Sequence, residues 1–208
     1  MGPYSEGIET GVQHREAFAD PRVLAVLLVW LVATGVGVGA LWRFSETPGE
    51  AAEAPLAWPA ETGIPTTSGT PTLLVFVHSV CDGSRATLSV LDDVLEDARR
   101  PVSTHVVVES GTDSAEIVRR AREIVGVEVR VERDELEARR FGVHTAGQVL
   151  LYDERGVLRF SGGITLGRPR LGSSRGADHL RALLSGRASE TVALARADVF
   201  GCDQRAVP

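Results

Sequence analysis

The sequence lacks lysine, and all 22 of its Lys-plus-Arg residues are arginines. Its formal net charge is −6, and it has no basic stripe interleaved with aromatic residues, which argues against a nucleic-acid-binding protein. A glycine-rich phosphate loop, a dinucleotide fingerprint and a Ser-His-Asp order are also missing, so no cofactor is predicted. Cysteine is scarce as well. Any thiol chemistry must use Cys81 and Cys202, because the sequence has no others.

One long apolar run is present, VLAVLLVWLVATGVGVGALW at residues 23–42. A helix of about 20 residues spans the hydrocarbon core of a bilayer, and Trp42 at its end suits the headgroup zone. A cleaved signal peptide is the alternative, since the small residues at 38–40 offer a cleavage site. The segment before the run is long and acidic, however, unlike a short basic leader. The run therefore predicts a retained transmembrane helix.

Arginines flank this run unequally, with Arg15 and Arg22 before it and Arg43 shortly after it. The positive-inside tendency then places residues 1–22 in the cytoplasm as a short tail. The rest of the chain is expected on the periplasmic, extracytoplasmic side of the cell membrane, as in a single-pass protein. Residues 43–70 are rich in Pro, Ala, Glu, Thr and Gly and predict a linker, of which the stretch PLAWP can pack back onto the domain.

Regular apolar patterns begin at residue 71 and predict one domain over residues 71–186, followed by a C-terminal tail over 187–208 that carries Cys202. The continuous apolar run TLLVFVH is typical of a strand buried on both faces. The expected strands lie at 72–78, 102–109 and 127–131, with a hairpin over 147–163, and the expected helices lie at 84–99, after a cap at Asp113, after Asp134 and at 177–185. This order, β-α-β-α-β-α-β-β-α, predicts an α/β sandwich with a central mixed sheet.

Two stretches resemble the thioredoxin fold, and together they span most of residues 71–185. The first, TLLVFVHSVCDGSRATLSVLDDV, places a cysteine between a buried strand and its helix. The second, RVERDELEARRFGVHTAGQVLLYDERGVLRFSGGI, resembles the segment of periplasmic thioredoxin-like proteins in which a helix leads to a strand, a D-x-x-G turn and another strand. More narrowly, the H-x-x-C-x-x-S-R-A run, SGGIT and the terminal FGC are similar to membrane-anchored thioredoxin-like proteins of the RedB type.

The resemblance implies thiol–disulfide chemistry with the thiols and disulfides of partner proteins, and the sequence departs from the family pattern at two places. The narrower family has a second cysteine two residues after the first, where this chain has Gly83. Thioredoxins also place a cis-proline that touches bound substrate just before the strand at 148–152. The corresponding substrate-binding positions here are Thr145, Ala146 and Gly147.

Cys81 is the predicted nucleophile. A thiol at a helix N-terminus feels partial positive charge and can accept hydrogen bonds from unpaired backbone N–H groups, which lowers its pKa. Arg85 lies one turn further and can assist, whereas the carboxylate of Asp82 acts in the opposite direction. Ser84 can cap the helix or bond the thiolate. His78 ends the strand three residues earlier and can orient or deprotonate the thiol.

Cys202 is the second candidate catalytic residue. In an oxidising compartment two cysteines invite one disulfide, and a bridge between Cys81 and Cys202 would close a loop of more than a hundred residues. Such a bridge can be a static staple or a step in a catalytic cycle that Cys202 resolves. Alternatively, Cys202 lies in a frayed terminus and pairs with nothing.

Two other functions stay open at this stage. The domain can be a non-catalytic interaction or scaffold domain that kept the fold and lost the activity, since fold alone does not imply function. It can also handle copper or zinc through Cys81, His78, His144 and Cys202, although no two of these have a spacing diagnostic of a metal site. No metal is therefore assigned.

Overall fold

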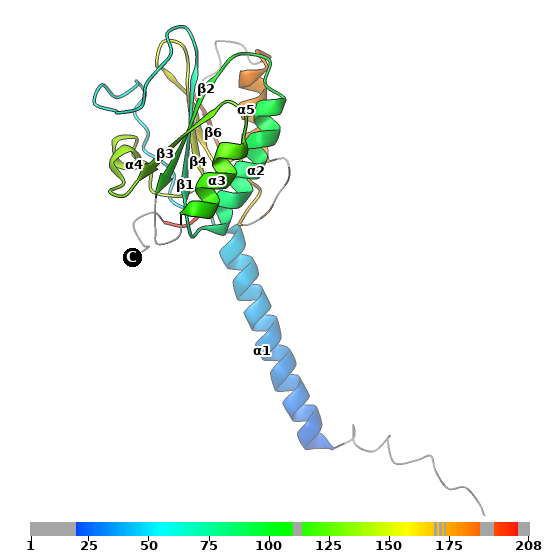
Figure 1. Cartoon of the computed structure of the whole chain (residues 1–208). Coiled ribbons are helices and arrows are strands. Elements are labelled where there is room, and N and C mark those ends of the chain that lie inside the picture. Colours follow the sequence, from blue (N-terminus) through cyan, green and yellow to red (C-terminus); the bar gives the residue numbers. More distant parts are fainter. Residues whose placement is uncertain are drawn as a thin grey trace, which may run out of the picture. The chain divides into compact units, whose positions relative to one another are not determined.

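The computed structural model describes residues 20–109, 114–168, 170, 172, 174–187 and 194–203 (Figure 1). The chain divides into two compact units, residues Met1–Phe44 and Ser45–Pro208. The first unit contains most of helix α1, and the second contains the sheet and the remaining helices.

Helix α1 spans Pro21–Glu46, and its 26 residues extend beyond the apolar run at both ends. Asp20 precedes it and accepts a hydrogen bond from the Arg22 N–H at 2.8 Å, which satisfies one of the free donors of the first turn. At 1.5 Å per residue the helix is about 39 Å long, compared with about 30 Å of hydrocarbon in a bilayer. It is long and apolar enough to cross a membrane, and none of its residues is buried.

The second unit is built on one six-stranded sheet with the strand order β3-β2-β1-β4-β5-β6. The central strand β1 runs parallel to β2 and antiparallel to β4, and β6 runs parallel to β5. The strands are β1 (Thr72–His78), β2 (Ser103–Glu109), β3 (Val127–Glu132), β4 (Gln148–Tyr152), β5 (Leu158–Gly162) and β6 (Ala195–Arg196). This arrangement confirms the predicted α/β sandwich with a central mixed sheet.

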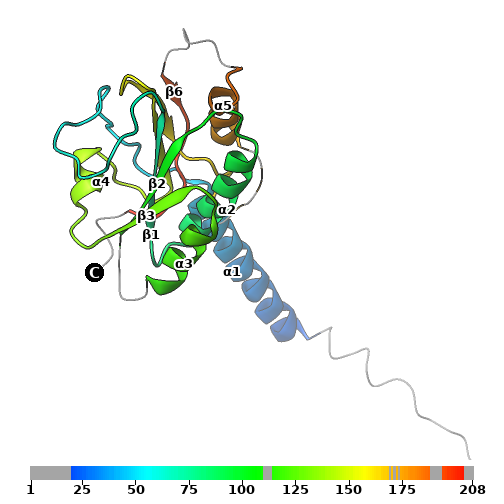
Figure 2. The same cartoon turned by 45° about the horizontal axis from the view of Figure 1, so that its top comes forward.

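Three helices cover one face of the sheet, and α4 lies on the other face (Figures 1 and 2). The helices are α2 (Asp82–Glu96), α3 (Ala115–Glu123), α4 (Leu136–Arg140) and α5 (Arg175–Leu184). Leu88 and Leu91 of α2 and Leu180 of α5 pack in one buried cluster with alternate residues of β1. Since β1 is buried along its whole length, both of its faces contribute to a core, as its continuous apolar run predicted.

Helix boundaries differ from the sequence expectation where turns and caps set them. Helix α2 begins at Asp82 rather than at residue 84, so that Cys81 itself is the N-cap residue. Helix α5 begins at Arg175, since the Ser174 hydroxyl accepts the Ala177 N–H at 3.1 Å and caps the helix. The expected cap at Asp113 lies outside the described residues.

The segment expected as a linker, residues 43–70, packs against the domain over much of its length. Ala52 and Ile64 are buried in the core cluster on the α4 face of the sheet. Trp58, from the PLAWP stretch, makes edge-on ring contacts with Phe141 and Tyr152, with centroids 5.2 and 5.1 Å away. The expected linker is therefore largely part of the domain, because it supplies apolar side chains that cover this face.

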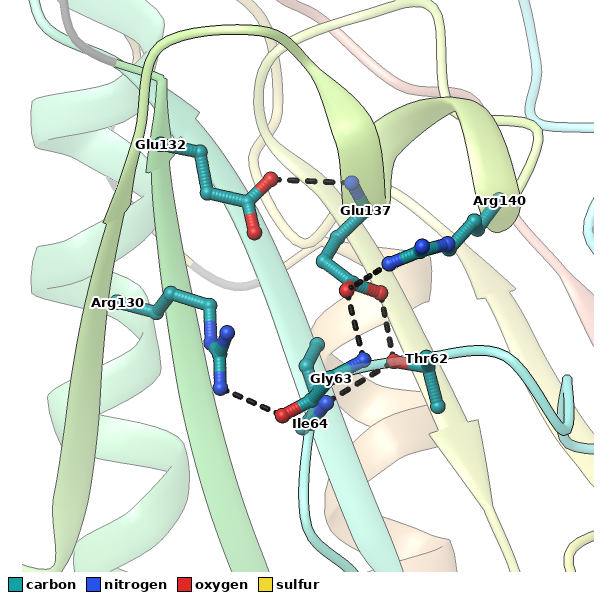
Figure 3. Close-up of polar contacts among 7 residues, drawn as sticks. All are labelled: Thr62, Gly63, Ile64, Arg130, Glu132, Glu137 and Arg140. Atoms are coloured by element: carbon teal, nitrogen blue, oxygen red, sulfur yellow. Dashed lines mark hydrogen bonds and ion pairs between the residues drawn. The ribbon is translucent and has the colours of Figure 1, made fainter.

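A buried carboxylate fastens this segment to α4 (Figure 3). Glu137, only 2% exposed, accepts hydrogen bonds from the Thr62 hydroxyl at 2.6 Å and the Gly63 N–H at 2.8 Å. The Arg140 guanidinium pairs with the same carboxylate at 2.7 Å. Burial alone would raise the pKa of Glu137, but these three donors outweigh it and hold the pKa below its usual value.

Removing this carboxylate should destabilise the domain. Glu137→Ala removes the charged acceptor that Thr62, Gly63 and Arg140 share, and the loss of these charge-assisted contacts costs about 2–4 kcal/mol. The measurement is urea unfolding of the full chain in detergent micelles, followed by fluorescence. A matched control is Glu154→Gln, which removes one side of a surface ion pair with Arg100 and should cost less than about 1 kcal/mol.

The same carboxylate gives the stability a pH dependence of known sign. A carboxyl whose folded-state pKa is depressed stabilises the fold above its ordinary pKa of 4.5, and this contribution is lost as the pH falls below that value. The stability deficit of Glu137→Gln relative to the parent should therefore be smaller at pH 3 than at pH 7. An equal deficit at both pH values would contradict the role of the ionised carboxylate.

Candidate functional site

Cys81 lies between the end of β1 and the start of α2, with an extended backbone at φ −95° and ψ 117°. The turn is closed by two backbone hydrogen bonds, from the Cys81 N–H to the His78 carbonyl at 3.3 Å and from the Ser84 N–H to the Cys81 carbonyl at 3.0 Å. This geometry holds the thiol at the N-terminus of α2, where the Gly83 and Ser84 N–H groups lower its pKa. The predicted position of the cysteine is therefore observed.

Cys202 lies directly against Cys81, although 121 residues separate them in the sequence. The Cys202 N–H donates a hydrogen bond to the Cys81 Sγ at 3.2 Å. The Cys202 side chain also acts on the pKa of Cys81, and both cysteines are free thiols in the structure. The two cysteines of the chain thus form one site.

The two thiols have opposite pKa shifts. The hydrogen bond from the Cys202 side chain is the largest influence on Cys81, and together with the N–H groups of Cys202, Gly83 and Ser84 it lowers the pKa of Cys81 to about 6. Burial opposes this shift without cancelling it. The pKa of Cys202 is raised, because its thiol donates to the Cys81 sulfur and because it is partly buried. Cys81 is therefore the thiolate of the pair at neutral pH.

Gly83 explains how Cys202 can reach this place. A Cβ at Gly83 would lie 3.0 Å from the Phe200 carbonyl oxygen and 3.5 Å from the Cys81 Sγ. The position where the narrower family has its second cysteine is thus the position against which the C-terminal segment packs. In this chain the second thiol beside Cys81 comes from the C-terminal segment rather than from α2.

Ser84 and Arg85 lie next to Cys81 but make other contacts than the predicted ones. The Ser84 hydroxyl accepts the His78 N–H at 2.9 Å, so it ties β1 to α2, and no side chain caps α2. The Arg85 guanidinium pairs with Asp82 at 2.9 Å and with Glu116 at 3.2 Å. Since Arg85 and Asp82 neutralise each other, neither of their predicted effects on the thiol is a leading cause of its pKa shift.

His78 is buried at the end of β1, and its ring is turned to a neighbouring amide. Its Nδ1 accepts the Val80 N–H at 3.3 Å, so this nitrogen is not available to the thiol. Burial lowers the pKa of His78, with the charge of Glu135 opposing, which favours the neutral ring. In the part of the chain that the structure describes, no group of three or more His, Cys, Asp or Glu residues is arranged to hold a metal ion.

Thr145 and Ala146 contact the C-terminal segment through their backbone. The Ala146 N–H donates to the Cys202 carbonyl at 2.9 Å, and Thr145 forms an antiparallel bridge with Asp203. Gly147 faces the other way, with its N–H donating to the Phe76 carbonyl at 2.7 Å. The structure therefore brings the predicted substrate-binding positions and both cysteines together.

Gly201 is a site residue that the sequence reasoning missed. A Cβ at this position would lie 1.7 Å from the Ala146 carbonyl oxygen, so only glycine fits the close approach of the two backbones. The SGG stretch has a related role, because Cβ atoms at Gly162 and Gly163 would lie 2.4 Å from the Ala197 oxygen and 2.7 Å from the Asp198 oxygen. The glycines of SGGIT and FGC are the sequence features that indicate this close approach of the C-terminal segment to the domain.

Comparisons with known proteins concern the fold. No family model and no curated protein matches the sequence. A hypothetical protein from Sinorhizobium meliloti 1021 aligns with a TM-score of 0.51 and 18% identity, over 77% of this chain and 95% of that chain. An uncharacterized conserved protein from Geobacillus kaustophilus gives a TM-score of 0.51 and 16% identity, over 76% and 91% of the two chains.

A third solved structure is the pneumococcal exposed lipoprotein thioredoxin Etrx1 from Streptococcus pneumoniae. It shows 18% identity and a TM-score of 0.42, covering 57% of this chain and 86% of that chain. The likeness to these solved structures is one of fold alone. From β1 to α5 the strands and helices follow the order that the sequence predicted, whereas β6, which joins the sheet, lies in the segment expected as a tail. The narrower likeness to RedB-type proteins stays a prediction.

Proposed function

We propose that this chain is a membrane-anchored, extracytoplasmic thioredoxin-like protein that exchanges disulfides with partner proteins. Cys81 is the nucleophile and Cys202 the resolving thiol. The observation that carries this proposal is the hydrogen bond from the Cys202 N–H to the Cys81 Sγ at 3.2 Å, which puts a second thiol beside an activated one. Helix α1 serves as the anchor, and the fold is compatible with such chemistry.

The first step uses the Cys81 thiolate. It attacks one sulfur of a partner disulfide, so that a Cys81–partner disulfide forms, the partner's S–S bond breaks, and its other sulfur leaves as a thiolate that takes up a proton. Residues 145–147 are proposed to bind the partner's backbone beside the reacting sulfur. The Gly83 and Ser84 N–H groups keep the attacking sulfur ionised until it reacts.

The second step uses Cys202. Its pKa is raised mainly because it donates to Cys81, and this cause disappears once the Cys81 sulfur belongs to a disulfide. Cys202 then gives its proton to water and attacks the Cys81 sulfur, which releases the partner's second thiol and leaves a Cys81–Cys202 disulfide. The partner gains two electrons and this chain loses two. A dithiol reductant restores the chain by the reverse exchange.

The test of the nucleophile is the pH dependence of alkylation at Cys81. Iodoacetamide should modify Cys81 with a half-maximal rate near pH 6, compared with about 8.5 for a free thiol, and peptide mapping separates it from Cys202. The double variant Asp82→Asn/Arg85→Ala is the control, and should shift the midpoint by less than about half a unit because these two charges pair with each other and neither is a leading cause of the pKa shift. A Cys81 midpoint at or above pH 8.5 would remove the basis of the proposal.

A non-catalytic interaction domain is the second candidate. The observation that favours it is the burial of Cys81, which is only 2% exposed and thus closed to a partner's sulfur in this conformation. Under this alternative the pair of thiols is a packing contact. The chain would then fail to form a covalent intermediate with any disulfide substrate while remaining folded.

A further inference from the structure

The C-terminal segment 195–203 docks on the domain in an extended form, mainly through its backbone. Strand β6 runs along β5, and the Ala197 N–H continues this contact to the Ser161 carbonyl at 3.2 Å. The Asp198 carbonyl then accepts the Gly163 N–H at 3.3 Å, and the Val199 carbonyl accepts the Gly49 N–H at 2.8 Å. Such docking by main-chain hydrogen bonds is the way in which an added peptide strand binds an exposed edge.

The end of this segment lies where a partner would have to bind. The Cys202 carbonyl accepts a hydrogen bond from the Ala146 N–H, and Asp203 forms an antiparallel bridge with Thr145. The backbone groups proposed to bind a partner are therefore already hydrogen-bonded within the chain. The Gly201 backbone lies so close to Ala146 that no side chain fits between them. Docking at this edge therefore excludes a second polypeptide from it.

The docked segment also closes access to the nucleophile. Cys81 is 2% exposed and Val199 is 1% exposed. The Phe200 carbonyl lies against Gly83, next to the Cys81 sulfur. Nucleophilic attack on a disulfide needs the attacked S–S bond to approach the thiolate in line, and the docked segment leaves no room for this. The reactive conformation must differ from the docked one.

We propose that residues 199–203 are a built-in competitor of the partner, an internal segment that holds the edge at Thr145–Ala146 in the resting chain and must leave before Cys81 reacts. This inference rests on the proposed function. The incoming partner is an extended, cysteine-bearing protein segment that takes over the same Ala146 N–H. When the partner's backbone leaves while its disulfide to Cys81 persists, the segment returns and brings Cys202 to the sulfur that it resolves.

The decisive variant is Gly201→Ala, which prevents close docking at Ala146. It is made in a Cys202→Ser background of the full chain in detergent micelles, so that Cys81 is the only thiol. Undocking should raise the iodoacetamide labelling rate of Cys81 by at least about tenfold. Asp198→Ala in the same background is the matched control, because its exposed side chain lies in the same segment, and it should label at the parent rate.

Hydrogen exchange of the Cys202→Ser chain without further substitution provides the second measurement. The amides of Ala146 and of residues 197–202 should exchange at least about 100-fold faster than those of β1, because undocking is a local opening of the fold. Equal exchange rates for these amides and β1 would overturn the proposal, whether or not Gly201→Ala folds. An unchanged labelling rate in a folded Gly201→Ala chain would overturn it as well.

These readouts separate the proposed release of residues 199–203 from the proposed redox function. Labelling and hydrogen exchange detect release of the segment and require no disulfide exchange. If Gly201→Ala exposes Cys81 but the Cys81 thiolate forms no mixed disulfide with an oxidised peptide, the proposed function is wrong. The proposal that residues 199–203 cover Cys81 then still holds. If the mixed disulfide forms at the same rate in the parent and in Gly201→Ala, the proposed function holds. The proposal that residues 199–203 must leave before Cys81 reacts is then wrong.

Discussion

Replacing Cys202 with serine is expected to stop exchange at the mixed disulfide between Cys81 and its partner. Without the second thiol, no group of this chain can attack the Cys81 sulfur, since the sequence has no other cysteine. Reduction of an oxidised peptide by the full chain, with a dithiol as electron donor, should fall by at least about 100-fold at low donor concentration. The covalent adduct should accumulate and be visible by intact mass.

Cys81→Ser is the variant with which the adduct-accumulating Cys202→Ser chain is compared. It removes the nucleophile, so it should abolish both turnover and the adduct, whereas Cys202→Ser abolishes turnover alone. Burial raises the pKa of the Cys202 thiol and the charge of Arg168 opposes this, whereas the backbone N–H groups of Gly83 and Ser84 lower the pKa of Cys81. An adduct on Cys202 in the Cys81→Ser chain, formed as fast as on Cys81, would reverse the assignment of roles.

Oxidation of the two thiols to a disulfide should stabilise the domain strongly. The bridge would join residues 121 positions apart, and closing a loop of this length in the unfolded chain is worth about 5 kcal/mol in the chain-entropy model. The folded chain already holds the two sulfur-bearing side chains in contact, so little rearrangement opposes the bond. The difference in free energy of unfolding between oxidised and reduced chains, measured in urea, should therefore approach this value.

The control for this effect is the Cys81→Ser/Cys202→Ser double variant, which should unfold identically in oxidising and reducing buffers. Stabilisation would also fix the C-terminal segment, so the fast hydrogen exchange of residues 197–202 should disappear on oxidation. An oxidised chain no more stable than the reduced one would mean that the bond strains the docked segment.

Much of the fold follows from local patterns in the sequence. The run at 72–78 predicted a strand buried on both faces, and β1 is that strand, because a central strand must be apolar on both sides. The packing of residues 43–70 was harder to foresee, since their Pro-rich composition is typical of a linker and their few apolar side chains have no period. Only Trp58 in the PLAWP stretch indicated the contact that the structure contains.

Of the two cysteines of the site, only the position of Cys81 could be predicted from the sequence. A cysteine between a buried strand and a helix locates Cys81, because that loop always lies at the helix N-terminus. The position of Cys202 depends on a non-periodic segment held by backbone hydrogen bonds, and such bonds leave no trace in side-chain type. The exceptions are the glycines that permit close approach, Gly83 and Gly201, which become informative once the two backbones are seen together.

The most direct test of the account is the identity of the disulfide that forms when the full chain is equilibrated with oxidised and reduced glutathione. Peptide mapping of the oxidised sample should find one internal bond, between Cys81 and Cys202, with the intact mass lowered by two hydrogens. It should form reversibly as the glutathione ratio changes. Persistent glutathione adducts on Cys81 with Cys202 still a free thiol would contradict the central claim that these two residues are a redox pair.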